Sequence, residues 1–313
     1  KILTTTIGSW RLERMLRVLT DKGLKTATVS QLKQNTQFKG WICQPNQYVI
    51  DVEKWTVRQT VCGHPEEQSI GNFNPIKETI CPNQNCFCGN DIEMRKGKNK
   101  DYLKLLKHAP DKVDPYKGEK ILAIDNENRV NVNFYTEKRC NFACSYCEPE
   151  NHTSTQIIDI EKYKEAWRTI NPRNVSTINI SGGEPTLNKN YIDFVKWLKG
   201  NNPYARISTS TNGTKSAEYL NHLNTYSHLA ISIHFEFITD RYISKLHRFL
   251  NSRNDKKSVR LKCMLRPEKV PQVKSFVAQF RKYRDLDMTV TPLWTPGTKE
   301  IMEYESEVWS LVA

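Results

Sequence analysis

The stretch KRCNFACSYC, residues 138–147, decides the fold assignment, because its cysteines Cys140, Cys144 and Cys147 form a C-x3-C-x2-C motif beside a strand. The preceding run, 130–135, alternates apolar and polar residues over most of its length, as a half-buried strand does. In α/β barrels the loops at the carboxyl ends of the strands carry the active site. The sequence therefore predicts that this motif lies at the functional end of an α/β domain.

Outward from this loop, strand-like and helix-like segments alternate. Strands are predicted at 130–135, 177–180, 206–211, 229–234, 259–265 and 288–293, and helices at 160–170, 191–198, 217–223, 243–250 and 273–283. Such alternation is typical of parallel βαβ units. Because no further strand–helix pair follows Trp294, the sequence predicts a partial (βα)6 barrel rather than a complete eightfold one.

Two further motifs follow the second and third predicted strands. The second strand ends in SGGEPTL, where Gly182 and Gly183 let the backbone approach a ligand and Glu184 offers a carboxylate to a bound ammonium group. The third ends in Ser210 and Asn212 within the sequence STNG, a turn suited to hydrogen-bonding a polar ligand. Alone, a Gly-Gly-Glu-Pro run is only a strand-to-helix turn, but here it follows the cysteine loop by one βα unit.

Together, the cysteine motif with Tyr146 before its last cysteine, the Gly-Gly-Glu-Pro turn and the Thr-Asn-Gly strand end resemble the radical S-adenosylmethionine (SAM) superfamily, over roughly 121–294. The resemblance implies that the three cysteines hold a 4Fe–4S cluster whose open iron binds the amino and carboxylate groups of SAM. It also implies reductive cleavage of SAM to methionine and a 5′-deoxyadenosyl radical, which abstracts a substrate hydrogen, with flavodoxin or ferredoxin as reductant.

The resemblance also assigns SAM contacts residue by residue. Gly182, Gly183 and Glu184 match the turn that contacts the SAM amino group, and Tyr146 matches the residue beside the adenine. The remaining candidates for ribose and carboxylate contacts are Ser210, Asn212, Ser232 and His234.

Strand alternation predicts which side chains face the barrel interior. Ser232 and His234 point inward on the fourth strand, and Arg260 and Lys262 on the fifth, whereas Cys263 falls on the apolar face as a buried, unreactive thiol. The interior is then polar and partly cationic, which favours a polar or anionic substrate and makes Arg260 and Lys262 candidate substrate contacts. His234 is either a proton-transfer group or a hydrogen-bonding pocket residue.

A second cysteine group lies nearer the N-terminus, spaced C-x18-C-x18-C-x4-C-x-C: Cys43, Cys62, Cys81, Cys86 and Cys88. It resembles the SPASM or twitch auxiliary-cluster domains of many radical SAM enzymes, although those usually follow the barrel and here the cysteines precede it. Five cysteines exceed the four that one cluster needs, so one is spare or His64 is a chance neighbour. An auxiliary 4Fe–4S cluster, a zinc site and no metal remain open, as do electron uptake, substrate binding and a purely structural role.

The predicted domain organisation has five parts. A helical segment, 1–38, with an amphipathic helix over 9–22, precedes an irregular α+β auxiliary-cluster domain, 39–94; a basic linker with a short helix, 95–120, leads to the partial barrel, 121–295, and a tail, 296–313.

Composition narrows the class of protein. Lys and Arg number 47 against 34 Asp and Glu, a formal charge of +13, but the excess is spread along the chain and there is no aromatic-basic stacking pattern. An odd count of 9 cysteines without a signal peptide disfavours a disulfide framework, and no apolar run approaches about 18 residues, so a cytoplasmic location without a membrane span is expected.

The sequence leaves the substrate open. The leading hypothesis is a radical SAM enzyme that modifies a peptide or protein side chain, and the alternative is a dehydrogenase or epimerase of a sugar, cyclitol or amino sugar. A non-enzymatic, zinc-containing nucleic-acid-binding protein would explain the charge and the cysteines, but it leaves the Gly-Gly-Glu turn unexplained.

Overall fold

The chain divides into two compact units in the computed structural model. Unit 1 comprises Lys1–Val49, Thr56–Val132 and Pro172–Asn174, and unit 2 comprises Ile50–Trp55, Asn133–Asn171 and Val175–Ala313. The structure describes residues 15–32, 37–60, 62, 65–84, 86, 94–107, 114–125, 129–136, 138–147, 149, 152–253, 258–283, 286–293, 295 and 301–305.

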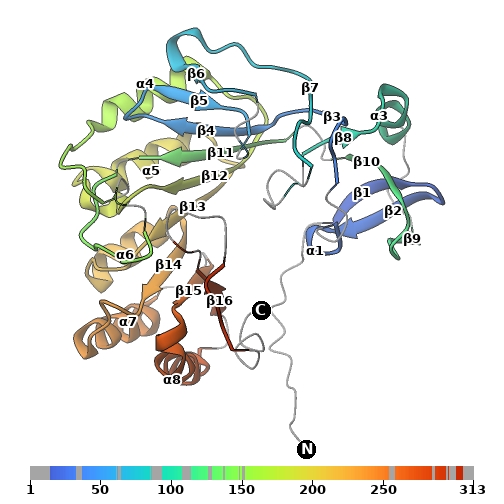
Figure 1. Ribbon diagram of the computed structural model, residues 1–313. Helices are drawn as coiled ribbons and strands as arrows, with labels where there is room; N and C mark the ends of the chain where they lie inside the picture. Colours follow the sequence, from blue (N-terminus) through green and yellow to red (C-terminus); the bar gives the residue numbers. More distant parts are fainter. Residues whose placement is uncertain are drawn as a thin grey trace, which may run out of the picture. The chain divides into compact units, whose positions relative to one another are not determined.

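Unit 1 is built on a sheet of seven short strands in the order β7-β3-β8-β10-β1-β2-β9 (Figure 1). Their bounds are β1 Met15–Thr20, β2 Gly23–Thr28, β3 Ile42–Cys43, β7 Thr79–Ile80, β8 Lys96–Gly97, β9 Asp114–Pro115 and β10 Ile121–Asp125. The unit also contains α1 Val29–Leu32, β5 Thr56–Arg58, β6 Gln68–Ser69, the 3-10 turn Ile70–Asn72 and α3 Lys100–Lys107. The division between the units falls within β4, Gln47–Asp51, and β11, Val130–Tyr135.

The predicted helix over 9–22 is wrong where the structure describes it, and residues 9–14 lie outside the described part. β1 and β2 form an antiparallel hairpin, with Leu16 opposite Ala27 and Val18 opposite Lys25. Leu16 and Val18 are buried on one face, while Leu19 packs with Leu106 and Ala123 on the other. The apolar spacing fits a helix equally well; pairing of β1 with the distant β10 decides for a strand.

The segment 95–120, predicted as a basic linker with a short helix, is a folded part of unit 1. The helix is present as α3, but β8 and β9 on either side of it join the sheet. Leu103 and Leu106 of α3 are buried, whereas Lys100 and Lys104 are largely exposed. The basic side chains therefore cover the solvent side of a packed helix rather than mark a connector.

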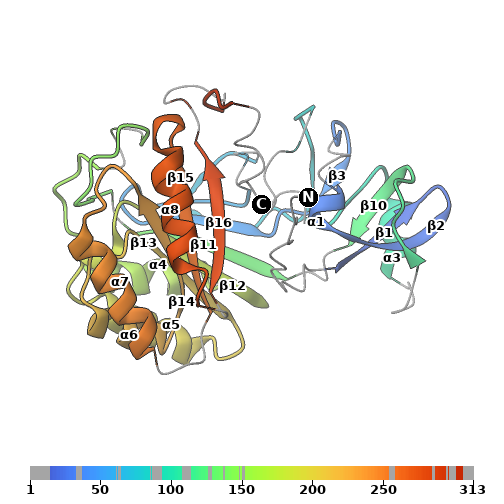
Figure 2. The same cartoon turned by 90° about the horizontal axis from the view of Figure 1, so that it is seen from below.

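Unit 2 is a mixed α/β fold whose sheet has the strand order β16-β15-β14-β13-β12-β11, with neighbours from β12 to β16 parallel (Figures 1 and 2). The strands after β11 are β12 Val175–Ser181, β13 Arg206–Thr211, β14 His228–His234, β15 Val259–Leu265 and β16 Asp287–Pro292. The helices are α4 Ile160–Ile170, α5 Tyr191–Asn201, α6 Ala217–Asn224, α7 Asp240–Ser252 and α8 Val270–Phe280, with 3-10 turns at Pro185–Leu187 and Pro267–Lys269. Each predicted strand and helix is present, within a few residues of its predicted bounds.

Side-chain alternation in the central strands agrees with the sequence. In β14 the apolar Leu229, Ile231 and Ile233 are buried while the residues between them are partly exposed. In β15 Cys263 is fully buried on the apolar face, where burial raises the pKa of its thiol to about 12. Its predicted role as an inert core thiol is consistent with both observations.

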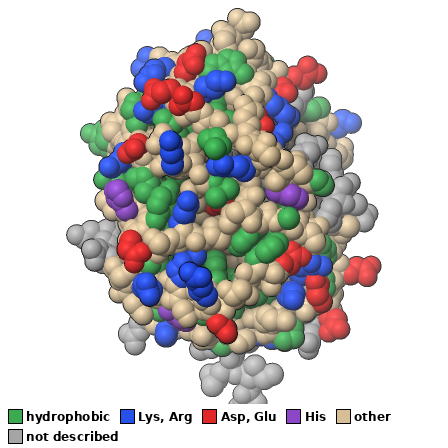
Figure 3. Space-filling view, turned by 90° about the vertical axis from the view of Figure 1, so that its left-hand side faces the viewer, with side chains coloured by type: hydrophobic (Ala, Val, Ile, Leu, Met, Phe, Trp, Pro, Cys, Tyr) green, Lys and Arg blue, Asp and Glu red, His purple; other side chains and the backbone are tan. Residues whose placement is uncertain are grey.

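Surface charge is mixed on the face of the protein that Figure 3 shows. Lys and Arg side chains are scattered there among Asp and Glu and form no single continuous patch. Within the described residues, no helix combines the length and apolarity that crossing a bilayer requires.

Candidate active site

A pocket of about 430 Å3 lies within unit 2 at the carboxyl ends of its strands. Its lining residues are Cys140, Phe142, Cys144, Tyr146, Cys147, His152, Gly182, Gly183, Ser210, Thr211, Asn212, Ser232, His234, Met264 and Leu293. The predicted cysteines, Tyr146, the two glycines and all four further SAM-contact candidates are thus brought to one pocket. Of the predicted SAM-site residues, only Glu184 does not line it.

The cysteine loop is compact and partly buried. The Cys147 amide donates to the Cys144 carbonyl at 3.0 Å, and the Phe142 amide lies 3.4 Å from the Cys140 sulfur. Burial raises the pKa of Cys140, and it raises that of Cys144 to about 12. In the protein alone these thiols therefore stay protonated at neutral pH. A bound metal centre reverses this preference, because a coordinating thiol is deprotonated.

The donor set fits an iron–sulfur cluster better than a single ion. Among the described residues, no three His, Cys, Asp or Glu side chains come together closely enough to hold one metal ion. Cys140, Cys144 and Cys147 instead line one pocket from one loop, as a cluster that distributes its ligands over several irons requires.

Gly183 is required by a close approach of two backbones. A Cβ at this position would lie 2.3 Å from the Arg139 carbonyl oxygen and 2.7 Å from that of Lys138. The next amide, Glu184, donates to the same Arg139 carbonyl at 2.8 Å. The Gly-Gly turn is thus packed directly on the start of the cysteine loop.

The Glu184 carboxylate differs from its predicted role. Its side chain is 0% exposed, and it accepts hydrogen bonds from the Thr186 amide at 3.0 Å and hydroxyl at 2.5 Å, the Thr211 hydroxyl at 2.8 Å and the Asn212 amide at 2.6 Å. The carboxylate is therefore occupied by protein donors instead of being offered to a ligand ammonium. It ties the Gly-Gly-Glu turn to the end of β13.

Asn212 extends this framework to the cysteines. Its side-chain amide donates to the Asn141 side-chain oxygen at 2.8 Å and lies 3.9 Å from the Cys140 sulfur. Its own carbonyl accepts from the buried Tyr242 hydroxyl at 2.9 Å. Glu184, through Asn212, thus connects three strand-end loops around the pocket.

His234 lies against the cysteine loop. Its Nδ1 is 2.5 Å from the Tyr146 hydroxyl and 3.2 Å from the Cys144 sulfur, and its ring is stacked on Tyr146. Burial lowers the pKa of His234 to about 4 and raises that of Tyr146, so the imidazole and the phenol are both neutral and share a hydrogen bond at Nδ1.

Two charged side chains that contact Ser145 of the cysteine loop were not predicted from the sequence. Glu236, after β14, accepts from the Ser145 amide at 3.0 Å and from its hydroxyl at 2.5 Å. Arg266, after β15, donates to the Ser145 hydroxyl at 2.6 Å and pairs with Glu236. Burial would raise the pKa of Glu236, but these hydrogen bonds outweigh it and the pKa is lowered. Their positions in the sequence could have indicated them, because Glu236 and Arg266 come within two residues of the carboxyl ends of predicted strands.

Arg260 and Lys262, predicted as substrate contacts, do not line the pocket. Met264, two residues further along β15, does. Arg260 instead pairs with Asp287 of β16, with Nε 2.6 Å from the carboxylate. Arg260 and Lys262 lie further from the carboxyl end of β15 than Met264 does. Side-chain alternation therefore predicted the correct face of the strand but not which positions along it reach the pocket. No Lys or Arg is among the described lining residues, so the positive charge predicted for the interior lies outside the lining of this pocket.

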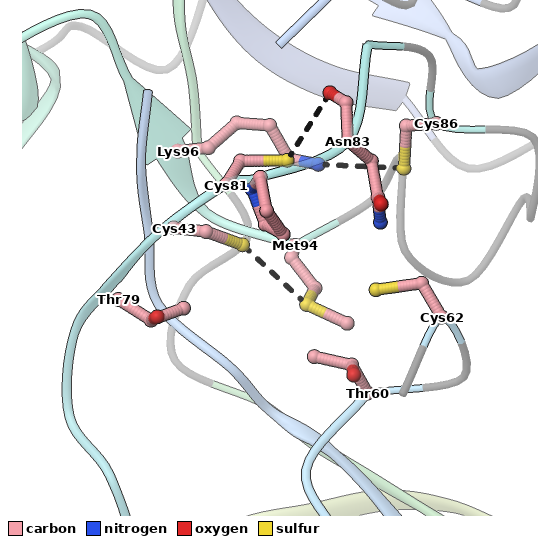
Figure 4. A pocket seen from close by; sticks show the side chains of 10 residues that line it. Cys43, Thr60, Cys62, Thr79, Cys81, Asn83, Cys86, Met94 and Lys96 are labelled. Atoms are coloured by element: carbon pink, nitrogen blue, oxygen red, sulfur yellow. Dashed lines mark hydrogen bonds between the residues drawn. The ribbon is translucent and has the colours of Figure 1, made fainter. Parts of the chain in front are cut away.

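Four of the N-terminal cysteines converge in unit 1. Cys43, Cys62, Cys81 and Cys86 line a cavity of about 20 Å3, and Figure 4 shows their sulfur atoms turned toward a common space. The remaining lining residues are Thr60, Thr79, Pro82, Asn83, Met94 and Lys96. Cys88 and His64 lie outside the described residues. These four thiols are the donor type of a metal–thiolate centre, and because no three described side chains lie close enough to hold a single ion, they fit a cluster that distributes its ligands over several irons better than one ion.

Comparison with known families agrees with the pocket. Residues 135–276, which carry the cysteine loop, the Gly-Gly-Glu turn and the strands up to β15, match the radical SAM superfamily. Residues 135–276 are therefore a radical SAM domain in sequence.

Individual relatives match over shorter stretches. The chain is 31% identical over 102 residues to a GTP 3′,8-cyclase of Desulforamulus reducens, covering 30% of this chain and 31% of that protein. It is 24% identical over 86 residues to a GTP 3′,8-cyclase of Vibrio vulnificus, covering 26% of each. The chain thus spans about a third or less of the length of these relatives.

Solved structures similar to the chain include native anSMEcpe with bound AdoMet, at 18% identity and a TM-score of 0.45, covering 56% of this chain and 55% of that one. BtrN in complex with AdoMet and 2-DOIA is 21% identical with a TM-score of 0.28, covering 37% of this chain and 54% of that one.

Proposed function

We propose that this protein is a radical SAM enzyme whose unit 2 pocket holds a 4Fe–4S cluster and SAM within a partial (βα)6 barrel. The observation that carries the proposal is the meeting, in one pocket of a radical SAM domain, of Cys140, Cys144 and Cys147 with the Gly182–Gly183 turn. When bound, the cluster supplies the electron that cleaves SAM to methionine and a 5′-deoxyadenosyl radical, which abstracts a substrate hydrogen.

The chain's own residues hold and orient these groups. The three thiolates bind the cluster, and the open backbone at Gly182 and Gly183 leaves room beside it. Glu184 acts as a positioning residue that fixes the surrounding loops, while Tyr146 and the neutral His234 form a polar wall. Flavodoxin or ferredoxin is the proposed reductant, and the cytoplasm is the proposed location.

The proposed substrate is polar, with a peptide or protein side chain first and a sugar, cyclitol or amino sugar as the alternative. Ser210, Asn212, Ser232 and His234 in the lining support a polar ligand, and the lack of Lys or Arg among the described lining residues favours a substrate without strong negative charge. The relatives are named for a nucleotide substrate, GTP, which is a third class to include in any assay.

A second centre is proposed in unit 1, as an auxiliary 4Fe–4S cluster in a SPASM- or twitch-like site. Its support is the convergence of Cys43, Cys62, Cys81 and Cys86 on one cavity. Because the ligands are thiols alone, zinc is the competing occupant.

Anaerobic reconstitution followed by iron, sulfide and zinc analysis tests both centres. About eight irons per chain supports two clusters and about four supports one, whereas zinc without iron overturns the enzyme proposal. Reduced protein should convert SAM to 5′-deoxyadenosine. Cys144→Ala should abolish that product, whereas Cys263→Ala, which removes a buried thiol away from the pocket, should retain it. Product from Cys144→Ala would refute the assignment.

A further inference from the structure

A buried lysine lies on the wall of the cysteine cavity in unit 1. Lys96 is 2% exposed and lines the cavity together with Cys43, Cys62, Cys81 and Cys86 (Figure 4). Lysine is almost never this deeply buried without a compensating partner, because removing an ammonium from water is costly. The spacing of the cysteines in the sequence does not explain why a buried lysine lies beside their four thiols.

The strand carrying Lys96 is fixed on both sides. In β8, Lys96 is opposite Cys43 of β3 on one edge and Ile124 of β10 on the other. The side chain extends from this central position toward the cavity instead of reaching solvent. Because β8 is paired on both edges, the Lys96 backbone has little freedom to move the ammonium group away from the cavity.

The ammonium group contacts a cavity thiol and a buried aromatic ring. Its Nζ is 3.9 Å from the Cys86 sulfur, and it lies over the ring of the buried Phe38, 4.4 Å from the centroid. Thiolate sulfur accepts hydrogen bonds, and an aromatic face attracts a cation. The contact with Cys86 places the positive charge beside a thiol of the cavity, and the contact with Phe38 helps to hold it there.

We propose that Lys96 is the counter-charge of an anionic metal–thiolate centre in unit 1 and that it raises the reduction potential of that centre. The inference rests on the auxiliary cluster proposed above. A cluster ligated by thiolates becomes more negative when it gains one electron, and a fixed positive charge in a low-dielectric site stabilises the reduced form more than the oxidised form. Net charge and hydrogen bonds to sulfur are the protein's means of setting such potentials.

The redox step is one-electron reduction of the centre. The electron comes from an external one-electron donor, dithionite in the experiment below, and no bond breaks and no proton moves. A raised potential favours electron uptake by the centre, which selects that role over a purely structural one.

The experiment is a potentiometric titration of the reconstituted full-length chain, followed by electron paramagnetic resonance. It is performed in the Cys144→Ala background, so that the unit 1 signal is observed without the unit 2 cluster. Lys96→Met removes the charge at similar length, and Lys96→Arg retains it. Lys98→Met is the matched control, because Lys98 lies two residues away, is exposed and contacts the Trp41 ring at 5.8 Å without lining the cavity.

We expect Lys96→Met to shift the midpoint potential downward, and Lys96→Arg and Lys98→Met to stay near the parent value. An unchanged midpoint in Lys96→Met with full iron content would overturn the proposal. Where Lys96→Met loses its iron, Lys96→Gln is measured as a second neutral variant. Loss of iron from both neutral variants but not from Lys96→Arg supports the counter-charge, whereas loss from all three overturns it.

Failure of the auxiliary cluster itself gives a different result. If the parent protein contains zinc or no metal in unit 1, the proposed second cluster fails before any variant is compared. If the parent contains the cluster and only the Lys96 comparison fails, the cluster stands and the role of Lys96 does not.

Discussion

Unit 2 supplies three thiols from one short loop, whereas unit 1 collects four from segments spread between positions 43 and 86. The unit 2 loop is held by buried polar groups on neighbouring strand ends, chiefly Glu184 and Asn212. The unit 1 cysteines depend on short strands such as β3 and β7 and on the side chains packed around them. Cysteines on one short loop are close in the sequence, and neighbouring side chains only need to orient the loop. Cysteines on separate segments come together only when the whole unit has folded.

The largest expected effect is at the framework of unit 2. Glu184→Ala leaves the donors of Thr186, Thr211 and Asn212 without their buried acceptor, which should cost about 3–5 kcal/mol of unfolding free energy. Iron in unit 2 and 5′-deoxyadenosine formation should fall together, while iron in unit 1 persists. Glu161→Ala is the control, because that carboxylate is 60% exposed and pairs with Lys164 on the surface, so its loss should change stability by at most about 0.5 kcal/mol. Equal effects of the two substitutions would contradict the framework role.

A smaller but still large effect is expected where the Gly-Gly turn meets the cysteine loop. Gly183→Ala places a methyl group 2.3 Å from the Arg139 carbonyl oxygen, which should cost about 3 kcal/mol and lower the iron content of unit 2. Gly200→Ala, in α5, meets nothing within 4 Å and should stabilise the protein by about 0.5–1 kcal/mol. Chemical denaturation and iron analysis of both variants check this pair. A neutral Gly183→Ala would show that the two backbones separate easily.

Unit 1 offers the counterpart of Glu184. Asp125 is buried and pairs with Arg17, at 2.6 Å, and with Arg95, at 3.4 Å. Asp125→Ala should destabilise unit 1 by about 2 kcal/mol, because Arg17 is partly exposed and regains some solvation. Iron should be lost from unit 1, with 5′-deoxyadenosine formation retained. If unit 2 lost its iron instead, the independence of the two sites would be refuted.

The smallest effect is expected at Lys245, which lines neither cysteine cavity and so serves as a reference. Burial, with a contribution from Arg241, lowers the pKa of Lys245 in α7 to about 8, below its ordinary value of 10.5. Between pH 8 and 10.5 the unfolded chain binds more protons at this residue than the folded one, so its burial penalty disappears as pH rises. Lys245→Met should raise the melting temperature slightly at pH 7, and the difference from wild type should shrink toward pH 10. The iron content of both units should not change, and a difference independent of pH would argue against the shift.

The regular half of the chain was predictable because its signals are local. Each strand of unit 2 has its own alternation or apolar run, and helix starts such as Ser216 and Thr239 carry their own capping side chains. The β1–β2 hairpin was not, because its pairing with β10 joins residues about a hundred positions apart, such as Leu19 and Ala123. Periodicity alone does not distinguish the two structures for so short a segment.

In the candidate site, too, the sequence predicted what depends on local motifs and missed what depends on contacts between distant residues. The three cysteines and the glycines follow from spacing, and the structure brings them together. The burial of Glu184 does not, since two of its donors belong to the next βα unit, at Thr211 and Asn212. The pairing of Arg260 with Asp287 likewise depends on the neighbouring strand.

The two units are interleaved along the chain, which has a consequence for synthesis. Ile50–Trp55 belongs to unit 2 but emerges from the ribosome in the middle of unit 1, and Pro172–Asn174 belongs to unit 1 but emerges after unit 2 has begun. Domains usually fold one after another as they are made. Here neither unit is complete until the other is partly translated, so unit 1 is expected to finish folding, and to become competent to load a cluster, only after synthesis has passed Asn174 and unit 2 has begun to form.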